Sequence, residues 1–261
     1  MKLSYYQVDA FTDRLFSGNP AGVCPLREWL PAETMQKIAL ENNQAETAFY
    51  VSGPGRRALR WFTPAVEVDL CGHATLAAAH VIFNIEGFSG PQIEFDSRSG
   101  LLAVRRDGER LTLDFPADVF APVEAPELLV RGLGASPAEA YKGKTDYLFV
   151  YDTEEAVARM KPDFGLIGGV SARGVIVTAR GRETDFVSRF FAPQAGINED
   201  PVTGSAHTTL APYWAGILGK TDLTAAQLSR RGGRLWCRCA GDRVEISGQA
   251  RAYLRGEIEI P

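Results

Sequence analysis

The sequence has no long hydrophobic run and no excess of basic charge. It also contains few cysteines and few histidines. Its 261 residues include four cysteines and three histidines, and the formal net charge is −4 at pH 7. Because no apolar segment reaches the roughly 20 residues that span a bilayer, no membrane association is expected. The N-terminal MKLSYYQVDA also has no hydrophobic signal-peptide core, so we expect a cytoplasmic protein.

The small number of cysteines and the lack of a basic stripe exclude further classes of structure and of binding partner. Cysteines 24, 71, 237 and 239 do not form a disulfide framework in a chain of this length, so we expect reduced thiols. Neither Cys71-x-His73 nor Cys237-x-Cys239 has the paired spacing of a structural zinc site, and we predict no metal. Nucleic acid is not an expected partner without a basic face, whereas isolated basic residues would suit a small anionic ligand.

The most informative feature that is present is an internal repeat. The segment RWFTP at 60–64 recurs as RFFAP at 189–193, and CGHATLAAAH at 71–80 is followed half a chain later by TGSAHTTLA at 203–211. A single repeat at half-length is not a solenoid, which needs shorter and more numerous units. It predicts two similar domains related by a pseudo-twofold axis.

Each copy of the repeat predicts the same local structure. An apolar strand, 59–62 or 186–191, ends at a proline, and after a loop a glycine, Gly72 or Gly204, opens a helix. The helix after Gly72 is apolar on all sides and is therefore predicted to be buried. In the second helix Pro212 predicts a kink.

Most of the remaining chain has the pattern of strands, so the predicted fold class is α+β. Strands are predicted at 102–106, 110–115, 147–151, 174–178, 235–239, 244–246 and 256–260, with surface helices at 31–41 and 152–160. We expect each domain to be a barrel-like sheet around its central helix. The first domain is predicted at 1–116 with returning strands at about 245–261, and the second at 117–244.

A cleft between two such domains is the expected ligand site. Two helix N-termini, at Gly72 and Gly204, would offer free N–H groups and partial positive charge to an anionic substrate such as a carboxylate. The alternative is that both glycines only allow the backbone to turn.

Two residues are candidates for proton transfer. Glu46 stands at the start of an apolar strand, where burial would raise its pKa into a range useful for acid–base catalysis; the alternative is a solvated glutamate at a strand end. Cys71 sits where two-base racemases place a thiol, but its counterpart Thr203 cannot take a proton from carbon. Asp200 precedes the second helix and would cap a turn or complement the helix dipole.

Several segments, in this order and spacing, resemble the phenazine-biosynthesis-like isomerases (PhzF-type proteins). They are VDAF at 8–11, SGNPAGV at 17–23, ETAF at 46–49, RWFTP at 60–64, CGHAT at 71–75, RFFAP at 189–193 and EDPVTGSAH at 199–207. The resemblance implies the diaminopimelate epimerase fold, with two alike domains and the active site between them. It also implies a cofactor-free isomerase that is usually a homodimer.

The resemblance also implies roles for individual residues. In the phenazine-pathway member a glutamate, which falls on Glu46, moves a proton between carbons of a cyclic dihydroxy-diene acid. The family's histidine, aspartate and serine fall on His73, Asp200 and Ser205, which would position the substrate and stabilise developing charge. The substrate carboxylate would sit on N–H groups near Gly72 and Gly204.

Two alternatives stay open at this point. Cys71 before Gly-His is similar to the epimerase and proline racemase relatives, so an amino-acid racemase or epimerase that uses Cys71 is one of them. The other is a metabolite-binding protein that keeps the cleft but has no turnover. The sequence names neither the natural substrate nor its pathway.

Overall fold

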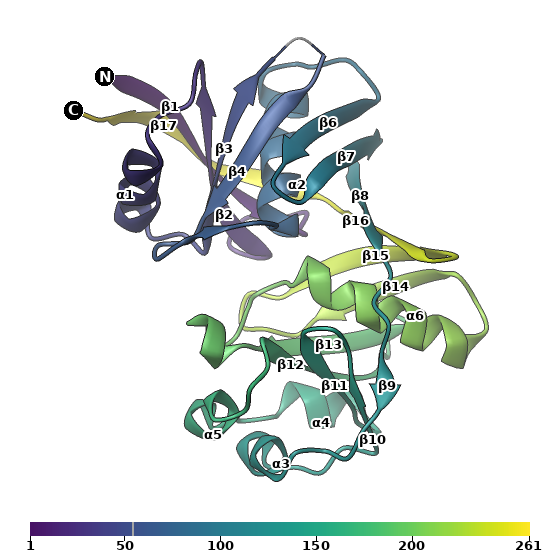
Figure 1. Ribbon diagram of the computed structural model, residues 1–261. Helices are drawn as coiled ribbons and strands as arrows, with labels where there is room; N and C mark the ends of the chain where they lie inside the picture. The colour runs from purple at the N-terminus through teal and green to yellow at the C-terminus, as the bar shows by residue number, and fades with distance from the viewer. Residues whose placement is uncertain (54) are drawn as a thin grey trace. The chain divides into compact units, whose positions relative to one another are not determined.

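A computed structural model describes residues 1–53 and 55–261, and the chain forms two compact units (Figure 1). The first unit comprises Met1–Asp114 together with Ser247–Pro261, and the second comprises Phe115–Ile246. The C-terminal strand thus belongs to the unit in which the chain begins.

The first unit is a sheet of mixed direction. Its strands are β1 (Lys2–Ala10), β2 (Asn19–Leu26), β3 (Glu46–Ser52), β4 (Arg57–Phe62), β5 (Glu67–Val68), β6 (Gln92–Ser97), β7 (Gly100–Asp107), β8 (Arg110–Pro116) and β17 (Ala250–Glu259). Strand β1 runs antiparallel to β17 and to β2, and β2 runs parallel to β3. Strand β3 is antiparallel to β4, β4 is parallel to β6, and β6, β7 and β8 form an antiparallel succession.

The second unit repeats this succession of pairings. Its strands are β9 (Ala121–Pro122), β10 (Glu139–Lys142), β11 (Asp146–Val150), β12 (Gly174–Arg180), β13 (Phe186–Phe191), β14 (Asp222–Gln227), β15 (Gly233–Ala240) and β16 (Arg243–Gly248). Strands β10 and β11 are antiparallel, β11 and β12 parallel, and β12 and β13 antiparallel. Strand β13 is then parallel to β14, which is antiparallel to β15. The repeat predicted from RWFTP and RFFAP is therefore a repeat of sheet topology.

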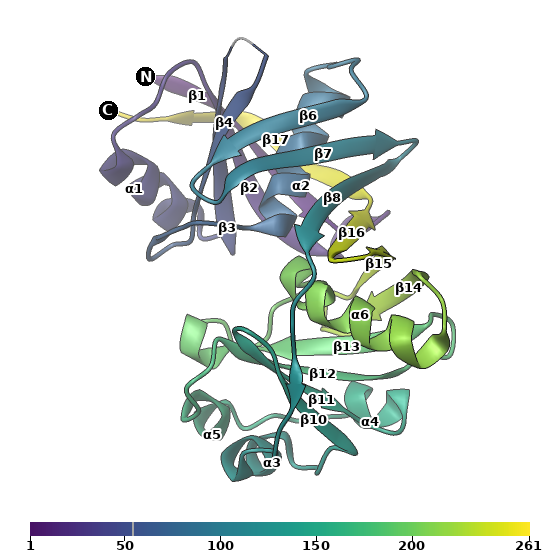
Figure 2. The same ribbon diagram turned by 45° about the vertical axis from the view of Figure 1, so that its right-hand side comes forward.

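Helix α2 (Gly72–His80) is the central helix of the first unit. Every residue from position 73 to 80 is buried, as predicted from a helix that is apolar on all sides. It lies against β1, β2, β3 and β17, and Figure 2 shows it within the strands of this unit. The chain continues as a π-helical turn, η1 (Val81–Ile85).

The corresponding helix of the second unit is α6 (His207–Leu218), preceded by a 3₁₀ turn, η3 (Gly204–Ala206). The helix continues through Pro212, although proline has no N–H to bond the carbonyl of Thr208 one turn earlier. The backbone N–H of Asp118 donates to that carbonyl instead, at 3.1 Å, and Thr209 Oγ1 donates to the Asp118 carboxylate at 2.8 Å. A loop thus supplies the hydrogen bond that proline removes.

The remaining helices are short. Helices α1 (Ala32–Asn42) and α4 (Glu154–Ala158) lie where the sequence predicts them, whereas α3 (Glu127–Leu133), α5 (Phe164–Gly168) and the 3₁₀ turn η2 (Pro193–Ala195) were not predicted. In the part of the chain that the structure describes, no helix is both long and apolar enough to cross a membrane. The predicted α+β class is confirmed.

Candidate active site

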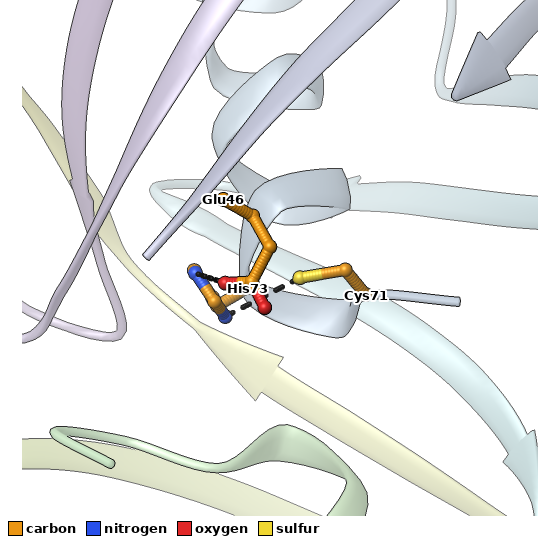
Figure 3. A group of neighbouring side chains, drawn as sticks. All are labelled: Glu46, Cys71 and His73. Atoms are coloured by element: carbon orange, nitrogen blue, oxygen red, sulfur yellow. Dashed lines mark hydrogen bonds and ion pairs between the residues drawn. The ribbon is translucent and has the colours of Figure 1, made fainter. Parts of the chain in front are cut away.

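Three titratable side chains of the first unit meet at the start of α2 (Figure 3). Glu46 is the first residue of β3, Cys71 directly precedes α2, and His73 lies in its first turn. The Nε2 atom of His73 lies 3.1 Å from Glu46 Oε2, and its Nδ1 atom lies 3.5 Å from Cys71 Sγ. The imidazole therefore stands between a carboxylate and a thiol.

The contact between Glu46 and His73 is a close ion pair that lacks hydrogen-bond alignment. Both facing atoms are buried, and neither has a well-aligned hydrogen-bond partner within the described residues. Buried polar atoms are seldom left so in native proteins. Since His73 is only 6% exposed, protein atoms rather than bulk water surround its ring. The two facing atoms thus form an ion pair that protein atoms shield from bulk water.

Asn19 is the third neighbour of the imidazole and was not singled out by the sequence analysis. Its Nδ2 atom lies 3.3 Å from His73 Nδ1, and the residue is fully buried at the start of β2. Its only signal in the sequence is its place in SGNPAGV. Because its amide can turn either its N–H₂ or its oxygen toward Nδ1, Asn19 can accommodate both protonation states of the ring.

The pKa values in this cluster reflect mutual charge interactions as well as burial. Burial alone would raise the pKa of Glu46, but the charge and hydrogen-bonding capacity of His73 outweigh it and lower that pKa. Burial alone would lower the pKa of His73, but Cys71 and Glu46 together raise it well above its ordinary value. Burial and the nearby Glu46 charge raise the pKa of the Cys71 thiol.

These directions favour one charge state near neutral pH. The raised pKa of Cys71 favours the neutral thiol and the lowered pKa of Glu46 favours the carboxylate, so Glu46 is the negative charge that favours an imidazolium at His73. The sequence-based expectation that burial raises the pKa of Glu46 is therefore wrong in direction. That expectation accounted for the apolar strand around Glu46 but not for a histidine brought to it from another element.

The start of the second central helix carries a hydrogen-bonded network instead. Thr203 Oγ1 donates to Asp200 Oδ2 at 2.5 Å, and the backbone N–H of Thr203 donates to Gln227 Oε1 at 2.8 Å. Gln227 Nε2 donates to the Asp200 carbonyl at 2.8 Å. Gln227, at the end of β14, was not predicted as a site residue and has no motif to mark it. It fixes the loop that carries Asp200.

Ser205 lies in η3 beside an arginine that the sequence analysis also missed. Arg173 Nη1 donates to Ser205 Oγ at 2.9 Å, and the Arg173 guanidinium forms a two-point ion pair with Asp146. Because the serine oxygen accepts from Arg173, its own O–H is free to donate to another acceptor. Gly204, the first residue of η3, is buried.

The predicted site residues are therefore distributed over the two units. Glu46, Cys71, Gly72 and His73 belong to the first unit, where the structure brings Glu46, Cys71 and His73 together. Asp200, Gly204 and Ser205 belong to the second unit, where Asp200 is linked to Thr203 and Ser205 to Arg173.

The same three residues of the first unit are those that could hold a metal ion. One ligand atom from each of Glu46, Cys71 and His73 lies within 4.8 Å of the others, the single such cluster among the residues described. Cys237 and Cys239, in β15, are not part of it. The spacing Cys71-x-His73 gave no indication of this arrangement, because the third group comes from a different strand.

Comparison with known proteins places this chain in a family. The sequence profile of the family described as phenazine biosynthesis-like protein (PhzC-PhzF) matches residues 8–256. A Pseudomonas aeruginosa protein named as an uncharacterised isomerase is 54% identical over 260 residues, which cover 100% of both chains.

Solved structures agree on the fold. The crystal structure of a PhzF-family phenazine biosynthesis protein of Enterococcus faecalis covers 100% of both chains with a TM-score of 0.97 and 48% identity. The structure of a protein named a predicted epimerase, from Pseudomonas aeruginosa, has a TM-score of 0.79 at 22% identity, covers 99% of this chain and 100% of its own, and shows a shared epimerase-like fold. The chain belongs to the phenazine biosynthesis-like (PhzF) family.

Proposed function

We propose that the protein is an isomerase that moves a proton between positions on a small carboxylate-bearing substrate, without a cofactor. The observation that carries the proposal is the buried ion pair of Glu46 and His73, whose facing atoms lie 3.1 Å apart and have no aligned hydrogen-bond partner among the described residues. The name isomerase given to close relatives supports the same class of reaction.

Glu46 takes and returns the proton in this proposal. As a carboxylate it is already in the form that accepts a proton, and burial next to a small substrate strengthens its interactions with the reacting carbon. The lowered pKa of Glu46 makes it a weak base on its own. Abstraction from carbon therefore requires that the resulting negative charge be stabilised.

His73 supplies that stabilisation as an imidazolium. Its raised pKa keeps it charged, and its Nε2–H faces the same space as the Glu46 carboxylate. A cationic donor beside an enolate-like intermediate stabilises charge that develops only during the reaction. Each partner thus holds the other in its reactive protonation state.

The substrate carboxylate is proposed to bind the first N–H groups of α2, at Gly72 and His73, where the helix dipole favours an anion. The family resemblance also predicts that residues of the second unit position the substrate, namely Asp200, Gly204 and Ser205. The Ser205 hydroxyl, which accepts from Arg173, is suited to donate to a substrate oxygen.

Proton exchange with solvent tests this function. The protein is incubated in deuterated water with a panel of small carboxylic acids that includes a cyclic dihydroxy-diene acid, and deuterium uptake at carbon is followed by NMR. Uptake by the wild type should fall by about 10³-fold in Glu46→Gln and be retained in Glu41→Gln, which alters an exposed glutamate of α1. Undiminished exchange in Glu46→Gln would remove Glu46 from the role.

A second candidate function has one observation in its favour. Cys71 Sγ lies 3.5 Å from His73 Nδ1, a contact through which imidazole could activate a thiol as the base of a racemase or epimerase. The raised pKa of Cys71 opposes this, because the thiol stays protonated near neutral pH. Full activity in Cys71→Ala would eliminate this candidate.

A further inference from the structure

We propose that Glu46, Cys71 and His73 also form a binding site for a thiophilic divalent metal ion such as Zn²⁺ or Cd²⁺, and that the bound ion inhibits the protein. The site goes beyond the proposed isomerase activity. It follows from the juxtaposition of one oxygen, one sulfur and one nitrogen ligand atom, all within 4.8 Å of one another.

The ligand set suits these ions. Zinc in proteins is bound by cysteine sulfur, histidine nitrogen and carboxylate oxygen at roughly 2.0–2.3 Å. Thiolate and imidazole together select zinc and its heavier analogue over magnesium or calcium, which require oxygen ligands. The separation of Oε2 from Nε2, 3.1 Å, is of the size that neighbouring ligands of one ion adopt, and the Cys71 sulfur belongs to a set of ligand atoms, one from each residue, that all lie within 4.8 Å of one another.

An independent observation supports a metal ion at this position. Nε2 of His73 and Oε2 of Glu46 are buried without an aligned hydrogen-bond partner in the described chain, and His73 is more than nine-tenths buried. An ion bound by both atoms satisfies both. Asn19, 3.3 Å from Nδ1, is placed to orient the ring through the other nitrogen, as outer partners of metal-binding histidines do.

Three protein ligands leave a tetrahedral ion with one open position, which water or a substrate carboxylate can fill. Inhibition follows because the ion occupies the Glu46 carboxylate and the His73 nitrogen that the proposed reaction needs. The ion is therefore expected to compete with proton transfer rather than to support it.

Among the residues that the structure describes, the second helix start offers no equivalent site. Thr203 and Ser205 stand at the positions that correspond to Cys71 and His73, and their hydroxyl groups are engaged with Asp200 and Arg173. One ion per chain is the expected stoichiometry.

The test is a titration of the reduced, chelator-treated full chain with cadmium chloride, followed by calorimetry and by the ultraviolet thiolate-to-cadmium absorption. We expect one equivalent to bind with a new absorption band. Cys71→Ser should lose the band, and Glu46→Gln and His73→Gln should bind at least about 10-fold more weakly, since each removes a ligand. The matched control is Cys239→Ser, which alters a partly exposed thiol of β15 and should leave both band and affinity unchanged.

Several results would overturn the proposal: no stoichiometric binding to the wild type, a band that persists in Cys71→Ser, or a band that disappears in Cys239→Ser. Circular dichroism checks that each variant is folded, and if Cys71→Ser is not, Glu46→Gln and His73→Gln decide the outcome. Inhibition is measured separately, as the loss of deuterium exchange on addition of zinc chloride. The titration needs no substrate, so its failure and the failure of the isomerase proposal are distinguishable.

Discussion

The segments CGHAT at 71–75 and TGSAH at 203–207 start the central helices of the two units. They share one hydrogen bond: the side chain four positions after Cys71 or Thr203 donates to the backbone carbonyl of Cys71 or Thr203. In the first copy Thr75 Oγ1 donates to the Cys71 carbonyl at 2.6 Å, and in the second His207 Nδ1 donates to the Thr203 carbonyl at 2.9 Å. The two helix starts are thus held in the same way by different side chains.

An ion pair is also shared. Arg60 forms a two-point pair with Glu67, with N···O distances of 2.7 and 2.8 Å, and Arg189 forms one with Glu199 at 2.7 and 3.0 Å. Both arginines are the first residues of the repeated segments RWFTP and RFFAP. The scaffold around each helix start is therefore duplicated down to its charge pairs.

The chemistry is not duplicated. The first helix start holds a carboxylate, an imidazole and a thiol in contact, whereas the second holds Asp200, Thr203 and Gln227 in a network of hydrogen bonds. The repeat thus preserves the framework, whereas a cluster of carboxylate, imidazole and thiol occurs, among the described residues, at the first helix start alone.

The largest effect is expected from removing the carboxylates. Glu46→Gln should reduce deuterium exchange by about 10³-fold, because it removes the proposed base. Asp200→Asn keeps an oxygen that can accept from Thr203 and should reduce exchange by only about 10-fold, because it removes charge but no proton-transfer group. Equal losses in the two variants would contradict the asymmetry.

The next effect concerns the duplicated ion pairs. Arg189→Met should lower the free energy of unfolding by about 4 kcal/mol, because it leaves Glu199 half-buried without its partner and also removes bonds to the Val157 and Met160 carbonyls. Arg60→Met should cost about 1–2 kcal/mol, because Glu67 keeps Arg98 at 2.8 Å. Urea unfolding of both variants measures the difference. A larger loss of unfolding free energy in Arg60→Met than in Arg189→Met would contradict this prediction.

The third effect is a pH dependence of stability that is expected from His207 but not from Thr75, the residue at the same position of the first copy. Burial lowers the pKa of His207 to about 4, so between about pH 6.5 and 4 the unfolded chain binds a proton that the folded chain does not. His207 alone should therefore lower the free energy of unfolding by about 3 kcal/mol as the pH falls through this window, and it should add no further loss below it.

The variant His207→Thr places the residue of the first copy in the second. It should be less stable than the wild type at pH 7.5 because of the cavity, but its stability should depend less on pH. Unfolding at pH 7.5 and 4.5 for both proteins isolates the contribution of His207, since His80, whose pKa burial also lowers to about 4, is common to both. An unchanged pH dependence in the variant would mean that His207 is not a buried neutral group.

The smallest effect is expected from Cys71→Thr, which places the residue of the second copy in the first. Because Glu46 rather than the thiol is the proposed base, exchange should fall by less than about 10-fold while stoichiometric cadmium binding is lost. Complete loss of exchange in a folded variant would favour the racemase alternative.

Much of the framework could be predicted from the sequence. The repeat, the glycine that opens the first helix and the strands 186–191, 102–106 and 110–115 were predicted, because hydrophobic periodicity and turn residues are local signals; Gly204 opens a 3₁₀ turn that precedes the second helix. Helices α3 and α5 were missed because segments of seven and five residues are too short to show a clear period.

The chemistry of the site was less predictable. Glu46 and His73 were both singled out, but their contact joins residues of separate elements, and the direction of the Glu46 pKa shift depends on that contact. Asn19, Arg173 and Gln227 have no sequence pattern that marks them, since each acquires its role from residues that are distant in sequence. The parts predicted for Asp200 and Ser205 in catalysis remain predictions.

The central claim is that Glu46 and His73 are an ionised pair, and NMR of isotope-labelled protein tests it most directly. At pH 7.5 the ¹⁵N shifts of His73 should show both ring nitrogens protonated, whereas the ring should be neutral in Glu46→Gln, because the carboxylate sustains the imidazolium. A neutral His73 ring in the wild-type protein at this pH would contradict the account.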